Sequence, residues 1–257
     1  SGEASIAPHG GLFLTPQTIS LSGSGPIHFT TNAREPNAND PIYTEPFEVT
    51  ESTVVRARVI EPGKVPGAIS TKTYLIGESF SDEMPVLSIV ADPETLFDDR
   101  IGIYLNKHES DVGVGPAVYK GKDAPGNLEF FLADGSTGFS VNGALRMGGE
   151  NNWASHFQRA FNFNIRGKYG DDELRYELFP QRGIPIYTAL TIREGGDDYG
   201  SARISDPIFD RIAKGRLNVE TNKSRASEVY INGEYWGHYN IRDRWNDHWF
   251  YQHYGTD

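Results

Sequence analysis

Cysteine is absent from the 257-residue sequence. This absence excludes disulfide bonds, zinc sites built on thiolates and thiol catalysis. Basic residues are also scarce, since 24 lysines and arginines stand against 35 aspartates and glutamates and give a formal net charge of −11. A protein without a basic field has little charge with which to displace the counterions of a nucleic acid. We therefore expect no nucleic acid among its partners, although individual basic sites are not excluded.

Long apolar segments are missing as well. No run approaches the roughly 20 residues that a membrane-spanning helix requires, so we expect no membrane span. The first residues, SGEASIAPHGG, lack the basic stretch and the apolar stretch of a signal peptide. A mature or excised chain would begin in this way.

Short alternating segments separated by prolines occupy residues 10–76. In STVVRARVIE, for example, Val55, Ala57 and Val59 fall on one face of an extended strand. Several such segments between glycine and proline turns predict a small antiparallel sandwich. The polar stretch GESFSDEMP lacks periodicity, so we interpret it as a linker. The predicted domains are therefore 1–80 and 84–257.

The second predicted domain combines hairpins with a few short helices. Asn232 and Gly233 form the strongest short hairpin signal, and AFNFNIRG alternates with Phe163 on its inner face. ADPETLFDD and ISDPIFDRIAKG predict helices, with Asp92 and Ser205 as their N-caps. We therefore expect this domain to be α+β and mainly antiparallel.

The segments GGLFLTPQTISLS, IHFTTNAREP and STKTYLI resemble the chitobiase/β-hexosaminidase C-terminal-type domain over nearly all of residues 10–76. The resemblance implies an all-β immunoglobulin-like sandwich that serves as an accessory module. The family usually has Asp-Gly in a turn where this chain has FTTNAREP, so only the threonines and Pro36 match. A spacer role is the first expectation, and binding of carbohydrate or of a surface is the alternative.

Four segments of the second domain resemble, in order, the spore coat protein H-like (CotH) kinase family. They begin with MPVLSIVADPE, NLEFFLADGS, LTIREGGDDYG and ASEVYINGEYWG. The resemblance extends from Met84 to the last residue and implies a kinase-N-lobe-like domain. It further implies ATP and Mg²⁺ as cofactors, a protein substrate on the cell or spore surface, and an extracellular or cell-surface location.

A glycine pair, Gly148 and Gly149, separates the predicted strand VNGALRM from a loop that carries Trp153. Glycines let backbone N–H groups approach phosphate oxygens. In the family a lysine after this loop contacts phosphate, and Arg159 of FQRAF takes its place here, which is not a neutral exchange. The resemblance thus implies nucleotide binding by the glycine pair and Arg159. Alternatively, the glycines form a plain hairpin end and Arg159 is a surface cation.

Paired acids, Asp197 and Asp198, lie in the glycine-rich turn REGGDDYG and are candidate ligands for Mg²⁺ or Ca²⁺. A solvated loop is the alternative for this turn. Asp243, at the end of a predicted strand, is expected to cap the last helix rather than to contact a ligand. The resemblance places the catalytic aspartates after this segment, so we expect the catalytic residues beyond Asp257.

Two functional hypotheses follow. In the first, the chain is a fragment of a secreted or surface atypical protein kinase, whose full-length parent uses ATP to phosphorylate surface or coat proteins. This chain alone is then expected to be inactive. In the second, the chain is a non-catalytic cell-surface or carbohydrate-associated binding or structural module.

Overall fold

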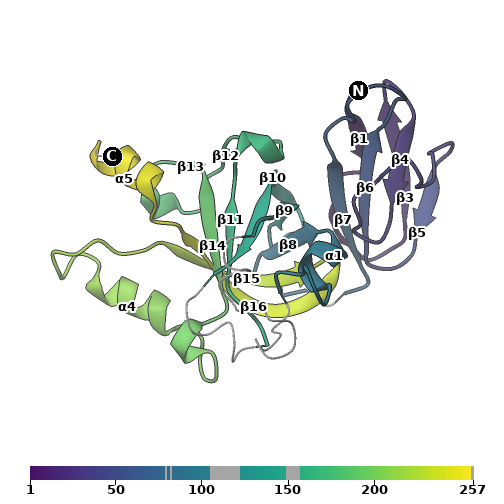
Figure 1. Ribbon diagram of the computed structural model, residues 1–257. Helices are drawn as coiled ribbons and strands as arrows, with labels where there is room; N and C mark the ends of the chain where they lie inside the picture. Colours follow the sequence, from purple (N-terminus) through teal and green to yellow (C-terminus); the bar gives the residue numbers. More distant parts are fainter. Residues whose placement is uncertain (79, 82, 105–121, 149–156, 256–257) are drawn as a thin grey trace.

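The computed structural model describes residues 1–78, 80–81, 83–104, 122–148 and 157–255. The described fold is mainly antiparallel β with few helices, as the sequence predicted. The strands up to Ile76 and the strands from Val86 onward belong to separate sheets. These two parts lie next to each other, with both termini at the periphery (Figure 1).

Two sheets make up the first part of the chain, with the orders β1-β3-β5 and β2-β7-β6-β4. Their strands are β1 (Ala4–Ala7), β2 (Gly11–Phe13), β3 (Gln17–Gly23), β4 (Ile27–Thr30), β5 (Phe47–Val49), β6 (Thr53–Val59) and β7 (Ser70–Ile76). An apolar cluster that includes Ile19, Val55 and Val59 draws on strands of both sheets. The sheets are therefore the two layers of a small sandwich.

Seven strands of the second part close into a barrel, in the order β10-β11-β14-β16-β15-β8-β9. They are β8 (Val86–Ala91), β9 (Ala124–Phe131), β10 (Thr137–Met147), β11 (Phe161–Asn164), β14 (Ala189–Arg193), β15 (Ser224–Ile231) and β16 (Glu234–Asp243). Buried apolar side chains such as Leu128, Phe163 and Ile241 form the core. Closure protects the strand edges, and no local sequence pattern predicted it.

Short helices accompany the barrel: α1 (Pro93–Phe97), α4 (Ser205–Ala213) and α5 (Asp247–Tyr254). Asp92 caps α1 as predicted, since its side chain accepts a hydrogen bond from Glu94 N at 2.9 Å. Ser205 is the first residue of α4 and not its N-cap, so that prediction is wrong by one position. In the described part of the chain, no helix has the length and apolar character needed to cross a membrane.

Turns connect the barrel strands. The hairpin of β15 and β16 turns at Asn232 and Gly233, whose φ angles of 53° and 87° suit a type I′ turn, as predicted. The connection from β11 to β14 carries a two-stranded sheet of β12 (Leu174–Arg175) and β13 (Ile186–Tyr187). The same connection contains the 3-10 turns η2 (Gly167–Tyr169) and η3 (Pro180–Arg182).

The sandwich packs against the barrel through the outer face of its β2-β7-β6-β4 sheet. Val54 of β6 clusters with Val90 of β8. Leu75 of β7 clusters with Val86 of β8 and Phe131 of β9. This contact explains why β6 is buried on both faces rather than on its sandwich face alone.

A carboxylate is completely buried at this contact. Glu129 of β9 is 0% exposed and accepts hydrogen bonds from Lys72 Nζ at 3.0 Å and Thr73 N at 2.6 Å. Burial raises the pKa of Glu129, although the charge of Lys72 and the hydrogen bonds from Lys72 and Thr73 oppose the shift. Thr73 Oγ1 also lies 2.7 Å from Ser88 Oγ. Polar groups of the two parts therefore satisfy one another at their interface.

Candidate functional site

Gly148 and Arg159 are brought together at one end of the barrel. Strand β10 ends just before Gly148, and its partner β11 begins just after Ala160. Gly148 N donates a hydrogen bond to Ala160 O at 2.8 Å. Backbone pairing thus places two of the predicted nucleotide-binding residues next to each other. The other glycine, Gly149, and Trp153 lie outside the described residues.

Arg159 is buried, with 7% of its surface exposed. Its guanidinium carbon lies 5.1 Å from the centroid of the Tyr104 ring, which is a cation–π distance. Desolvation lowers the pKa of Arg159, and the nearby phenols of Tyr104 and Tyr239 oppose the shift. The alternative interpretation of Arg159 as a surface cation is therefore wrong.

Side chains around Arg159 form a group that we call the rim cluster. Its members are Tyr104, Gln158, Arg159, Tyr199, Arg203 and Trp236. Gln158 is central, because its Nε2 donates to Trp236 O and its Oε1 accepts from Arg203 Nη1. Arg203 in turn lies 4.4 Å from the centroid of the Tyr199 ring. Segments that are distant in the sequence therefore meet around one buried arginine.

Tyr104 connects the rim cluster across the barrel end. Its hydroxyl donates to Phe157 O at 2.6 Å and accepts from Trp236 Nε1 at 2.8 Å. Burial raises the pKa of Tyr104, whereas the Trp236 hydrogen bond and the charge of Arg159 lower it. The phenol is therefore protonated at neutral pH, and its ring is a fixed platform for the Arg159 guanidinium.

This arrangement suits an anion. An arginine already ordered on an aromatic ring loses little further side-chain freedom when it binds a ligand. A partly desolvated environment also strengthens the attraction between a cation and an anion. A phosphate or carboxylate group is the class of ligand that a guanidinium in such surroundings attracts.

Asp197 and Asp198 lie in the 3-10 turn η4 (Gly196–Asp198), which follows the end of β14. The Asp198 carboxylate accepts hydrogen bonds from the Ser201 hydroxyl and, at 2.9 Å, from both N and Oγ of Ser205. These bonds, with that from Ser201 the largest cause, lower the pKa of Asp198. Asp198 therefore caps the start of α4, which disfavours the metal-binding role predicted for it.

The described residues do not supply a complete metal site. Across the ranges that the structure describes, no group of three or more histidine, aspartate or glutamate side chains could hold a metal ion. Asp197 is exposed and lies in the turn after β14, whose pairing with β11 brings it to the same barrel end as Gly148. It stays a predicted ligand that would need oxygen atoms from elsewhere.

Asp243, at the end of β16, forms a buried ion pair. Its Oδ2 accepts from Arg182 Nε at 2.6 Å and from Trp249 Nε1 at 2.7 Å. Both charged side chains are 3% exposed. Asn246 caps α5, so the capping role expected of Asp243 is wrong.

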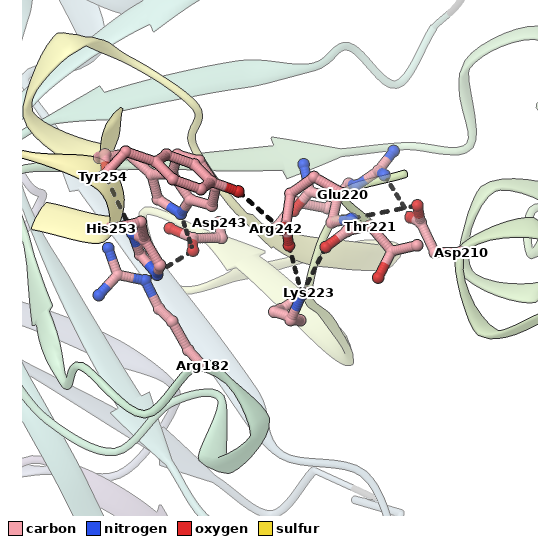
Figure 2. A network of polar contacts seen from close by, with 11 residues as sticks. Arg182, Asp210, Glu220, Thr221, Lys223, Arg242, Asp243, His253 and Tyr254 are labelled. Carbon is pink, nitrogen blue, oxygen red and sulfur yellow. Dashed lines mark hydrogen bonds and ion pairs between the residues drawn. The ribbon is translucent and has the colours of Figure 1, made fainter. Parts of the chain in front are cut away.

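Figure 2 shows the polar network that surrounds this pair. Arg242 of β16 donates to Asp210 of α4 at 2.7 Å. Glu220 accepts from Tyr254 of α5 at 3.0 Å and from Lys223 at 3.2 Å. Acidic and basic side chains are paired with each other here, and these ion pairs and hydrogen bonds connect β16, α4 and α5.

Sequence patterns alone did not identify the rim cluster. Tyr104, Arg203 and Trp236 lie in segments that only closure of the barrel brings together. Each of them taken singly is an ordinary polar or aromatic residue. The available signal was Arg159 in FQRAF, which the kinase resemblance singled out.

The two-sheet arrangement of the first part defines a small β-sandwich module. A family model for the chitobiase/beta-hexosaminidase C-terminal domain matches residues 8–71, which confirms the resemblance predicted for this part. No curated protein and no solved structure matches the chain. The comparisons give no evidence for the CotH resemblance of the barrel, so the kinase-like character stays a prediction.

Proposed function

We propose that the barrel end binds the phosphate groups of a nucleotide such as ATP, as part of a CotH-like kinase that acts on proteins at a cell surface. The position of Arg159 carries the proposal. Its guanidinium lies over the Tyr104 ring. In the sequence, Arg159 directly precedes Ala160, whose carbonyl accepts the hydrogen bond from Gly148 N. The barrel pairing therefore brings together two of the residues to which the sequence resemblance assigns the phosphate.

The chemistry of both residues supports a phosphate ligand. Arginine presents paired N–H donors that match phosphate oxygens. A Cβ added at Gly148 would lie 3.3 Å from the Ala160 Cβ, so a side chain at this position would crowd the neighbouring strand. Because the Gly148 N–H is bonded to Ala160 O, Gly148 supplies space at the strand end rather than a donor, and the phosphate contact is assigned to Arg159.

Magnesium has a smaller part in the proposal than Arg159. The resemblance implies Mg²⁺ together with ATP, and Mg²⁺ commonly takes most of its ligands from phosphates and water. Asp198 does not fit as a ligand, because its Oδ1 accepts a hydrogen bond from Ser201 and its Oδ2 accepts from Ser205 at the start of α4. Among the described acids, Asp197 alone is proposed to contribute.

Thermal unfolding with and without nucleotide tests this function. A ligand that binds only the folded protein raises the Tm, so ATP with Mg²⁺ should raise it. Adenosine should leave the Tm unchanged, because the proposed contacts are to phosphate. An equal shift with adenosine, or none with ATP, would overturn the proposal.

A second candidate function is favoured by the family match to residues 8–71. Under it, the chain is a non-catalytic, carbohydrate-associated binding or structural module at the cell surface. Retention on an immobilised polysaccharide, together with no Tm response to ATP, would favour this candidate over the kinase.

A further inference from the structure

A polar groove lies between the sandwich and the barrel. Its wider part, of about 430 Å³, is lined by Arg56 and Arg58 of β6 and by Lys168 and Tyr169 of η2. A narrower part, of about 270 Å³, continues from it. The two parts share the lining residues Ala68, Ile69, Asn142 and Gly170.

The wider part of the groove is cationic. Arg56, Arg58 and Lys168 line it together with one carboxylate, that of Glu35, in a chain whose net charge is −11. Arg56 is 3% exposed, donates from Nη1 to Ala33 O at 3.0 Å and lies 3.9 Å from Glu35. Among the described residues, the buried Nε of Arg56 has no hydrogen-bond partner.

Two of these cations are fixed at the groove walls. Arg58 Nε donates to Gly67 O at 2.6 Å on the sandwich side. On the barrel side, Lys168 Nζ lies 4.4 Å from the centroid of the Tyr169 ring and 3.3 Å from Asp123 Oδ2. The two positive charges therefore line the groove from opposite sides.

The narrower part carries hydrogen-bonding groups without a dominant charge. Asn127 and Asn142 occupy paired positions on β9 and β10. Asn127 Nδ2 donates to Asn142 Oδ1 at 3.0 Å and to Ser140 Oγ at 3.3 Å. Asp171 accepts from Asn142 N at 2.6 Å and also lines this part, as does Glu3. Amides, hydroxyls and carboxylates in such a row match the donor and acceptor pattern of sugar hydroxyls.

We propose that this interdomain groove binds an acidic saccharide. A sugar carboxylate would lie between Arg58 and Lys168, and sugar hydroxyls would contact Asn127 and Asn142. The lining has few apolar side chains, which disfavours a lipid, and no deep apolar pocket of the kind that anchors peptide side chains. The inference rests on the carbohydrate-associated candidate for its ligand class, and it is independent of phosphate binding at the barrel end.

Calorimetric titration with trigalacturonate tests this site. Maltotriose, a neutral trisaccharide, is the matched ligand and should bind at least about tenfold more weakly, because charge-assisted hydrogen bonds are the stronger ones. Combining Arg58→Gln with Lys168→Gln should weaken trigalacturonate binding about tenfold or more. Arg175→Gln changes an exposed arginine outside the groove and should have no effect.

A second variant tests whether trigalacturonate occupies the groove without changing the charge of the protein. Ala68 is exposed and lines both parts of the groove, so Ala68→Trp fills the groove without entering a core. This variant should lose trigalacturonate binding while its Tm stays unchanged.

Several results would overturn the proposal. They are no binding of trigalacturonate to the unaltered protein, unchanged binding to the Ala68→Trp variant, or equal binding of maltotriose. Equal binding of inorganic phosphate or of a triglutamate peptide would contradict the saccharide assignment. ATP titrated into the same samples reports on the barrel end, so that failure of one site is distinguished from failure of the other.

Discussion

Two places in the molecule hold a cationic side chain against a partner in different ways. On the barrel wall, Lys72 contacts the fully buried Glu129 at 3.0 Å. At the barrel end, Arg159 is 7% exposed and lies over the ring of Tyr104. The first arrangement joins opposite charges from two separate sheets, and the second places a cation on a neutral ring where a strand begins.

The two arrangements differ in the charge that remains when one of the two contacting side chains is removed. Without Lys72, the buried Glu129 would lose its charged partner and keep the hydrogen bond from Thr73 N, and breaking a buried ion pair is strongly destabilising. A cation–π contact contributes only about 0.5–2 kcal/mol, and it leaves the positive charge able to attract an anion. Burial of a charge therefore does not by itself indicate function, whereas the chemistry of its surroundings does.

The largest effect on the free energy of unfolding is expected from a change in the barrel core, on whose strands both Glu129 and Arg159 depend for their positions. Phe163→Ala should lower the free energy of unfolding by roughly 3–5 kcal/mol, because it opens a cavity among fully buried side chains. Phe157→Ala changes a phenylalanine that is 90% exposed, and as the matched control it should have an effect within about 0.5 kcal/mol. Urea unfolding followed by tryptophan fluorescence measures both. Equal effects of the two changes would contradict the packing described.

The next largest effect is expected at the interface of sandwich and barrel. Glu129→Ala should destabilise the protein by about 1–3 kcal/mol, since it leaves the buried Thr73 N–H without its acceptor and Lys72 without its partner. Limited proteolysis should then cut faster within residues 77–85, between β7 and β8, because the two parts separate more readily. A variant that is as resistant as the unaltered protein would show that the pair is not needed for docking.

The pKa of Glu129 gives a smaller, pH-dependent effect. Burial raises this pKa above its ordinary value of 4.5, so the folded protein binds the proton more tightly than the unfolded chain does. The resulting stabilisation is complete below the unfolded pKa and is lost as the pH rises through the folded pKa. Subtracting the pH profile of the Glu129→Gln variant from that of the unaltered protein should isolate this contribution. A difference that grows more stabilising with rising pH would show that Lys72 outweighs burial.

The smallest effect is expected at Asp198, whose bonds are local to one helix end. Asp198→Ala removes the acceptor for Ser201 and Ser205, so the Ser205 amide at the start of α4 should exchange its hydrogen faster. Asp197→Ala, at the exposed neighbour, is the matched control and should leave the exchange unchanged. Unchanged exchange with Asp198→Ala, together with lost Mg²⁺ binding, would favour the metal role instead of the cap.

Local features of the fold were predictable from the sequence. The cap at Asp92 and the turn at Asn232 and Gly233 depend on a few neighbouring residues, and the structure has both. Closure of the barrel depends on pairs such as Val86 with Glu228, which no local pattern contains. The double burial of β6 was missed for the same reason, because its second face is covered by a distant part of the chain.

The candidate site was predictable only in part. The kinase resemblance singled out Gly148 and Arg159, and strand pairing places them at one barrel end. Burial of Arg159 against Tyr104 was not predictable, because it results from a tertiary contact between distant segments. That burial changes the choice of test variant, since alanine at Arg159 would also remove packing against the ring.

Arg159 should provide much of the affinity of the barrel end for nucleotide phosphate, and calorimetric titration with ATP and Mg²⁺ measures this directly. Arg159→Met keeps an apolar side chain against Tyr104 and removes the positive charge. Because a hydrogen bond to a charged group contributes roughly 1.5–3 kcal/mol, ATP affinity should fall about tenfold to a hundredfold. Arg175→Met, at an exposed arginine of β12, should leave it unchanged. Equal ATP affinity of the Arg159→Met variant and the unaltered protein would contradict the assignment of phosphate to this end of the barrel.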